Sequence, residues 1–294
     1  MTWRIILFAA CALACASPAA AQKLKVVASF SILGDLTGRI AGDRVELKTL
    51  VGPDGDAHVF EPTPADARAV AQSQIFLING LDFEPWADRL AKSTDSRAKI
   101  VVASVDVKPL PFRAGTRALD PHAWQDARNA MTYVENITRA LAAVDAPNAE
   151  FYKANALAYL GELRGLDGDI RAAFAAIPAA RRRVITTHDA FSYFGKAYGI
   201  QLIAPLGTST EEQASAKAVA ALITQIKRER IAAVFVENVS DPRLIEQVAR
   251  ETGAKLGGKL FSDALSTKAG PAPTYIALMR HNAKLLTEAM APGF

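Results

Sequence analysis

Short apolar segments rich in β-branched residues alternate along the chain with longer segments in which apolar residues recur at helical spacing. The first pattern is typical of buried strands and the second of amphipathic helices. Strands that alternate with helices favour a parallel sheet with helices on both faces. The predicted strands cover residues 24–30, 45–51, 75–79, 99–102, 184–187, 201–205, 233–236 and 255–260.

Most of the intervening segments are predicted to be single helices of ordinary length. The exception is the segment 148–176, which has few helix breakers and predicts one long helix, with Gly161, Gly165 and Gly168 as weak points. The other predicted helices cover residues 32–40, 64–72, 84–92, 122–143, 190–198, 215–229, 242–252 and 273–290.

The two halves of the chain repeat the same order of elements. The strand Val26–Phe30 corresponds to Val184–His188, and Ile75–Gly80 corresponds to Val234–Asn238. The predicted fold is therefore α/β, with two lobes of the (β/α)4 type joined by the long helix. The predicted boundaries are 1–21 for a signal peptide, 22–147 for the N-terminal lobe, 148–177 for the linking helix and 178–294 for the C-terminal lobe.

The first 21 residues predict export. Arg4 precedes a short apolar stretch, and Ala19–Ala21 offers small residues for cleavage, which is typical of a secretory signal peptide with Gln22 as the new N-terminus. Two alternatives are an uncleaved membrane anchor and lipid attachment at Cys15. A soluble periplasmic protein is the favoured interpretation.

Composition restricts the chemistry of the exported protein. Both cysteines, Cys11 and Cys15, lie in the predicted signal peptide, so a metal site in the mature chain must use nitrogen and oxygen ligands. The formal net charge is only +4, and the cluster Arg181–Arg183 is interpreted as a surface at a helix end. We therefore expect no nucleic-acid partner.

Three of the four histidines occupy connections between predicted strands and helices. His58 follows a turn rich in glycine and aspartate, His122 lies between Pro121 and a predicted helix, and His188 ends an apolar strand. Asp263 occupies a matching position near the end of the chain. In open α/β sheets, ligands bind beyond the carboxyl ends of the strands. Two residues from each lobe would then meet in the cleft between the lobes.

Each of these residues also has an ordinary interpretation. A single histidine in a loop is usually a surface group, and Asp263 alone is typical of a helix N-cap. We also interpret His281, in the predicted helix 273–290, as a surface group. On topology alone, both interpretations stay open. If the four residues do bind one ion, three imidazoles and one carboxylate suit tetrahedral Zn²⁺ better than Mn²⁺, which usually takes more oxygen ligands.

Three features of the sequence near these residues each have two interpretations. Asp120 and Asp189 each adjoin a candidate histidine and are potential acceptors for its second ring nitrogen. Helix capping is the favoured interpretation for both. The run Thr208–Glu212 is interpreted as a helix-capping segment, and a supporting role at the cleft stays open for it.

At these residues the chain resembles the cluster A metal-binding proteins of ABC importers, which are periplasmic receptors for zinc and manganese. The resemblance rests on several motifs together and extends through most of the mature chain. They are Ala57-His58-Val59-Phe60-Glu61-Pro62-Thr63-Pro64, Asp120-Pro121-His122-Ala123-Trp124, Thr187-His188-Asp189-Ala190-Phe191-Ser192-Tyr193-Phe194, Glu237-Asn238 and Ser262-Asp263-Ala264-Leu265-Ser266.

The resemblance implies a binding protein rather than an enzyme. It implies His58, His122, His188 and Asp263 as the metal ligands, and delivery of the ion to a membrane permease driven by an ATPase. Manganese-selective members typically have glutamate at the position of His188, so this chain resembles the zinc branch. Many zinc members also carry a histidine-rich loop, but residues 103–119 contain no histidine. Zinc supply by a periplasmic chaperone or a less strict selectivity would explain that difference.

The predicted function is thus a monomeric, high-affinity periplasmic receptor with Zn²⁺ as its transported ligand. One alternative is the same role with Mn²⁺ or Fe²⁺. Less favoured alternatives are a secreted zinc hydrolase and a metal-containing adhesin. The hydrolase would need an open coordination position and a general base, and the chain has no His-Glu-x-x-His motif.

Overall fold

Each half of the chain forms one four-stranded parallel sheet. The computed structural model describes residues 23–112, 118–210 and 215–292. The strand orders are β2-β1-β3-β4 and β6-β5-β7-β8, so the two sheets have the same topology. The strands are β1 (Leu24–Phe30), β2 (Val45–Val51), β3 (Ile75–Ile78), β4 (Lys99–Val102), β5 (Arg183–Ile185), β6 (Gln201–Ile203), β7 (Ala233–Glu237) and β8 (Lys255–Leu260).

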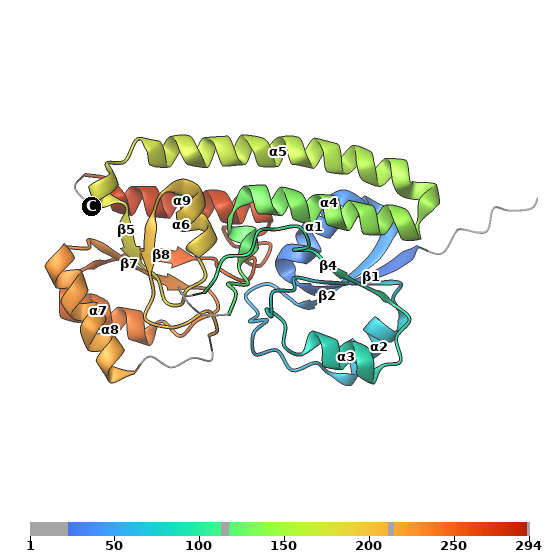
Figure 1. The fold of residues 1–294 in the computed structure, drawn as a ribbon, viewed down its shortest axis with the longest axis horizontal. Helices are drawn as coiled ribbons and strands as arrows, with labels where there is room; N and C mark the ends of the chain where they lie inside the picture. Colours follow the sequence, from blue (N-terminus) through green and yellow to red (C-terminus); the bar gives the residue numbers. More distant parts are fainter. Residues whose placement is uncertain (1–22, 113–117, 211–214, 293–294) are drawn as a thin grey trace, which may run out of the picture.

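Helices cover both sheets, and one of them extends along the whole molecule. In Figure 1, α5 runs past both sheets, with α4 and α9 between it and the strands. The α-helices are α1 (Ser31–Ala41), α2 (Pro64–Gln72), α3 (Ala87–Ser93), α4 (Ala127–Val144), α5 (Ala149–Ala175), α6 (Ser192–Tyr198), α7 (Ala216–Glu229), α8 (Arg243–Thr252) and α9 (Tyr275–Met290). Short 3₁₀ turns are η1 (Gly42–Arg44), η2 (Ala123–Gln125), η3 (Ala146–Asn148) and η4 (Ala179–Arg181).

These observations confirm the predicted fold class of two parallel-sheet lobes and one long helix. The glycines within α5 do not interrupt it, and the helix is continuous from Ala149 to Ala175. The exact domain boundaries stay a prediction. Residues 1–22, with the predicted signal peptide and Cys15, lie outside the described residues. Among the described residues, no helix combines the length and apolar character that a membrane span requires.

Several elements are shorter than predicted, and in two cases a buried carboxylate explains why. β3 ends at Ile78 because the N–H of Asn79 donates to Glu84 Oε1 at 2.7 Å. The N–H of Thr187 likewise donates to Glu237 Oε1 at 2.7 Å, two residues after β5 ends. These side chains compete with the sheet for backbone donors at the carboxyl ends of the strands.

The predicted helix 122–143 is also divided. Residues 123–125 form η2, and α4 begins only after Asp126, whose side chain caps it by accepting the N–H of Arg128 at 2.9 Å. His122 therefore precedes a tight turn and is not part of a regular helix. The predicted helices starting at 84, 190, 242 and 273 begin at Ala87, Ser192, Arg243 and Tyr275.

The buried apolar side chains form one large and one small cluster. One continuous cluster contains side chains of both sheets and of the long helix, for example Phe76, Leu166 and Phe235. A smaller cluster joins α7 and α8 to the second sheet through Leu222, Val248 and their neighbours. The elements around the large cluster are thus tied together by apolar burial, whereas α7 and α8 pack mainly on their own part of the second sheet.

Gly165 offers a test of the continuous α5. It is exposed, and a Cβ added there would meet no atom within 4 Å. Gly165→Ala is expected to raise the free energy of unfolding by about 0.5–1 kcal/mol, because alanine loses less conformational entropy in a helix. Chemical denaturation measures this. Gly199→Ala is the matched control and should destabilise, since Gly199 ends α6 at φ 73°. A destabilised Gly165→Ala would contradict a regular helix at this position.

Candidate metal centre

The four candidate residues converge on one point between the two sheets. One ligand atom from each of His58, His122, His188 and Asp263 can be chosen so that all lie within 4.8 Å of one another. The three residues His122, His188 and Asp263 are 0% exposed, and His58 is 8% exposed. This cluster lies beyond the carboxyl ends of the strands, where an open α/β sheet places its ligands.

The same kind of aspartate turn positions both histidines of the first half, His58 and His122. In each case an aspartate two residues earlier accepts the backbone N–H of the histidine: Asp56 for His58 and Asp120 for His122, both at 2.9 Å. Side chains of this type fold the chain into a tight turn without a regular element. The turn fixes the direction in which each imidazole leaves the backbone.

Asp120 also orients the imidazole of His122. Its Oδ1 lies 2.8 Å from His122 Nδ1, and both side chains are fully buried. A carboxylate at Nδ1 favours the tautomer with the proton on that nitrogen, which leaves a lone pair on Nε2. The favoured sequence interpretation of Asp120 as a helix cap was therefore wrong, and its alternative was right.

Glu237 does the same for His188, and sequence reasoning did not assign it this role. Its Oε1 accepts the N–H groups of Thr187 and His188, at 2.7 and 3.0 Å, while its Oε2 lies 2.5 Å from His188 Nδ1. Asp189, the sequence candidate for this role, instead accepts the hydroxyl of Ser192 in the first turn of α6. The sequence signals for Glu237 were its position just after the predicted strand 233–236 and its place in the motif Glu237-Asn238.

Asp263 faces all three histidines. Its oxygens lie 3.3 Å from His58 Nε2, 3.5 Å from His122 Nε2 and 3.1 Å from His188 Nε2. Among the described residues, none of these nitrogens and neither oxygen of Asp263 has a hydrogen-bond partner of proper geometry. Lone pairs that point at one another in a buried site repel, and only a cation between them can satisfy them all.

The electrostatics of the cluster follow from the same arrangement. Burial opposes the charged form of His188, but the carboxylates of Glu237 and Asp263 outweigh it and raise the pKa of this imidazole well above its usual range. Burial likewise opposes ionisation of Asp263, yet His188 and His122 hold the pKa of its carboxyl well below its usual range. The site therefore favours an anionic carboxylate paired with a bound cation, and a proton competes for the same position.

Aromatic side chains enclose the cluster on the side of the first sheet. The ring of Phe83 meets that of His58 edge-on with centroids 4.7 Å apart, and Trp124 meets His122 at 5.4 Å. Phe83 and Trp124 also contact each other, at 4.7 Å. This wall excludes water and lowers the local dielectric, which strengthens electrostatic interactions with a bound ion.

Asp263 is held to the first half of the chain, although it follows the last strand of the second. The carbonyl of Ser262 accepts the side-chain N–H groups of Trp124 and Gln125, at 3.0 and 2.8 Å. The N–H of Leu265 donates to Ser31 Oγ at 2.9 Å. Asp263 follows β8 of the second sheet, and these hydrogen bonds tie its segment to the body that carries His122. Ser262 and Ala264 also bind Asn238 of the second half.

The other features singled out in the sequence lie outside the cluster. His281 contacts the carbonyl of Lys259 through Nε2 at 2.9 Å and is not part of the metal centre.

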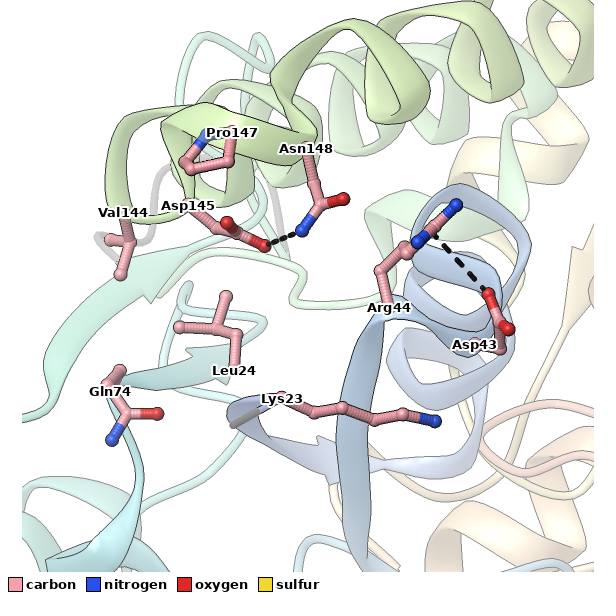
Figure 2. A pocket seen from close by; sticks show the side chains of 9 residues that line it. All are labelled: Lys23, Leu24, Asp43, Arg44, Gln74, Val144, Asp145, Pro147 and Asn148. Carbon is pink, nitrogen blue, oxygen red and sulfur yellow. Dashed lines mark hydrogen bonds and ion pairs between the residues drawn. The ribbon is translucent and has the colours of Figure 1, made fainter. Parts of the chain in front are cut away.

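A cavity of about 580 Å³ lies at the amino-terminal ends of β1 and β2, away from the metal centre (Figure 2). Four of its charged and polar side chains pair with one another, Arg44 with Asp43 and Asn148 with Asp145. We therefore place the functional site at the His₃Asp cluster.

Two α/β lobes, a long connecting helix and a cluster of ligand-type side chains between the lobes define a substrate-binding protein with a small cationic ligand. The chain belongs to the family described as ZnuA, zinc-uptake complex component A, periplasmic, whose model matches residues 26–289. Members of this family are metal-binding components of ABC importers and not enzymes.

Individual relatives agree on the family and differ in the metal for which they are named. The iron-binding protein YfeA of Yersinia pestis is 35% identical over 276 residues, covering 93% of this chain and 87% of that protein. A manganese-bound periplasmic metal-binding protein from Candidatus Liberibacter asiaticus is 31% identical, with a TM-score of 0.85 over 92% of this chain and 100% of that one. The periplasmic zinc-binding protein TroA of Treponema pallidum is 27% identical, with a TM-score of 0.87 over 92% and 99%.

The role of Glu237 can be separated from that of Asp189 by substitution. Glu237→Gln is expected to lower metal affinity about 10–100-fold, the usual effect of losing a carboxylate that supports a ligating histidine. Asp189→Asn is the matched control and should leave the affinity within about twofold, because Asp189 contacts Ser192 and not the imidazole. Competition titration against a chelator measures both. Equal losses in the two variants would show that Glu237 has no special role.

Proposed function

We propose that His58, His122, His188 and Asp263 bind one divalent metal ion, which the protein passes to the permease of an ABC importer. The observation that supports this most strongly is the set of buried, unpartnered lone pairs aimed at one point. Membership of the family supports the transport role and implies a membrane permease and an ATPase as partners.

We further propose that the ion is Zn²⁺. Three imidazoles and one carboxylate complete a tetrahedral shell, which is the usual geometry of protein-bound zinc. Mn²⁺ prefers more oxygen ligands, although relatives named for iron and manganese show that the fold accommodates other ions. With four protein ligands in place, no position is left for a reactive water, which suits capture and release rather than catalysis.

Three further expectations stay part of this proposal. The protein acts in the periplasm after cleavage before Gln22, and lipid attachment at Cys15 is the alternative. It works as a monomer. A periplasmic chaperone supplies its zinc, which would compensate for the lack of histidine in residues 103–119.

The metal content of the purified protein tests the function directly. The wild-type protein should hold one zinc ion per chain after exposure to equal concentrations of Zn²⁺, Mn²⁺ and Fe²⁺, and His188→Ala should lose stoichiometric zinc. His281→Ala should retain it, because His281 lies outside the cluster. Elemental analysis gives the ratios. Preferential loading with manganese or iron would overturn the choice of zinc, and full zinc retention in His188→Ala would overturn the ligand set.

Metal affinity should depend on pH in one direction. Only neutral imidazole binds metal, and the raised pKa of His188 means that the ion must displace a proton from it. Lowering the pH favours the protonated form, so the affinity should fall, by at least about tenfold between pH 7.5 and pH 5.5. Titration calorimetry at the two values measures this. Equal affinities would contradict histidine ligation.

A further inference from the structure

The four side chains of the metal centre differ in their access to solvent. His58 is 8% exposed, whereas His122, His188 and Asp263 are 0% exposed. His58 is therefore the ligand nearest to solvent.

Two aspartates link the loop that carries His58 to the second half of the chain. Asp54 binds Asn238 through its side chain and the carbonyl of Leu265 through its N–H, and Asp56 forms the link nearest to His58. Asp56 uses its two oxygens differently: Oδ1 accepts the backbone N–H of His58 at 2.9 Å, and Oδ2 accepts the hydroxyl of Thr210 at 2.5 Å. Thr210 lies 154 positions further along the sequence. The same carboxylate thus sets the turn that presents His58 and joins it to the second half.

The segment before Thr210 is in turn tied to His188. The carbonyl of Gly207 accepts the N–H of Asp189, the residue next to His188, at 2.9 Å. Hydrogen bonds through Asp56, Thr210 and Gly207 therefore connect the loop of His58 with that of His188. The run Thr208–Glu212 was predicted to cap a helix, with a supporting role at the cleft left open. The N-cap of α7 is instead Ser215, and Glu211 and Glu212 lie outside the described residues.

This connection can separate without disturbing the buried ligands. His122 and Asp263 are joined by independent contacts through Trp124, Gln125 and Ser262. Thr210 is only half-buried, and α7, which follows it, packs in the smaller apolar cluster. The free energy needed to detach a segment with few buried contacts is lower than that needed to unfold the core to which it is attached.

We propose that the hydrogen bond between Asp56 and Thr210 is a latch that controls how fast the bound metal leaves. The inference rests on the proposed metal-binding function, and it makes both residues positioning residues that act through His58. Opening of the latch frees the turn of His58 from the segment next to His188, while Asp54 still holds the start of the loop to Asn238 and Leu265. The ion then loses its most exposed ligand first, while Asp263 stays fixed to the body that carries His122.

Thr210→Val tests the latch, because valine keeps the shape of threonine and removes the hydroxyl. Zinc-loaded full-length protein is mixed with excess chelator and the rate of zinc loss is followed. We expect Thr210→Val to release zinc about tenfold faster, which corresponds to about 1.4 kcal/mol. Thr210→Ser should restore the wild-type rate, since it keeps the hydroxyl. The thermal midpoint of the metal-free protein should not change.

Two further variants distinguish loss of the latch from a general loss of stability. Thr224→Val is the matched control, because Thr224 is exposed on α7 and its hydroxyl bonds only within that helix, to the carbonyl of Ala220. It should release zinc at the wild-type rate. The double variant Asp56→Ala with Thr210→Val should release zinc no faster than Asp56→Ala alone, since the two groups form one interaction.

The outcomes separate the latch from the function on which it rests. Zinc binding by the wild-type protein with an unchanged release rate in Thr210→Val overturns the latch alone. An equal acceleration in Thr210→Ser, or additive effects in the double variant, overturns it as well. Failure of the wild-type protein to bind any divalent metal overturns the proposed function and the latch with it.

Discussion

The structure depends on one buried carboxylate. Asp263 is fully buried, and three imidazole nitrogens face it at 3.1–3.5 Å. A charged carboxylate is costly to remove from water unless a positive charge compensates it. Because the carboxylates of Asp120 and Glu237 occupy Nδ1 of two of these rings, the Nε2 atoms offer lone pairs to the same point. The cluster is therefore complementary to a cation.

The parallel topology explains how distant residues reach this point. Carboxyl ends of parallel strands lie on one edge of a sheet, so the loops that follow β2, β5 and β8 open toward the same region. Tight aspartate turns then set the direction of His58 and His122. The large apolar cluster and the hydrogen bonds around Ser262 hold His122 and Asp263 together.

Much of this arrangement could be predicted from the sequence, because it depends on local patterns. Strong apolar periodicity predicted the strands and the long helix, and scarce histidines in corresponding loops predicted which side chains would meet. The ends of elements were less predictable, since they depend on side-chain contacts outside the strand, such as that of Glu84 with the N–H of Asn79 after β3. Glu237 was missed as the partner of His188 for the same reason: its contact joins residues 49 positions apart. The favoured cap interpretation of Asp120 failed because its side chain instead binds the N–H and Nδ1 of His122, only two residues later.

The most direct measurement is X-ray absorption spectroscopy of the zinc-loaded protein. The account predicts a four-coordinate shell of nitrogen and oxygen at about 2.0–2.2 Å, with the outer-sphere scattering of three imidazoles. A six-coordinate shell dominated by oxygen, with no imidazole scattering, would contradict the assignment of His58, His122 and His188 as ligands.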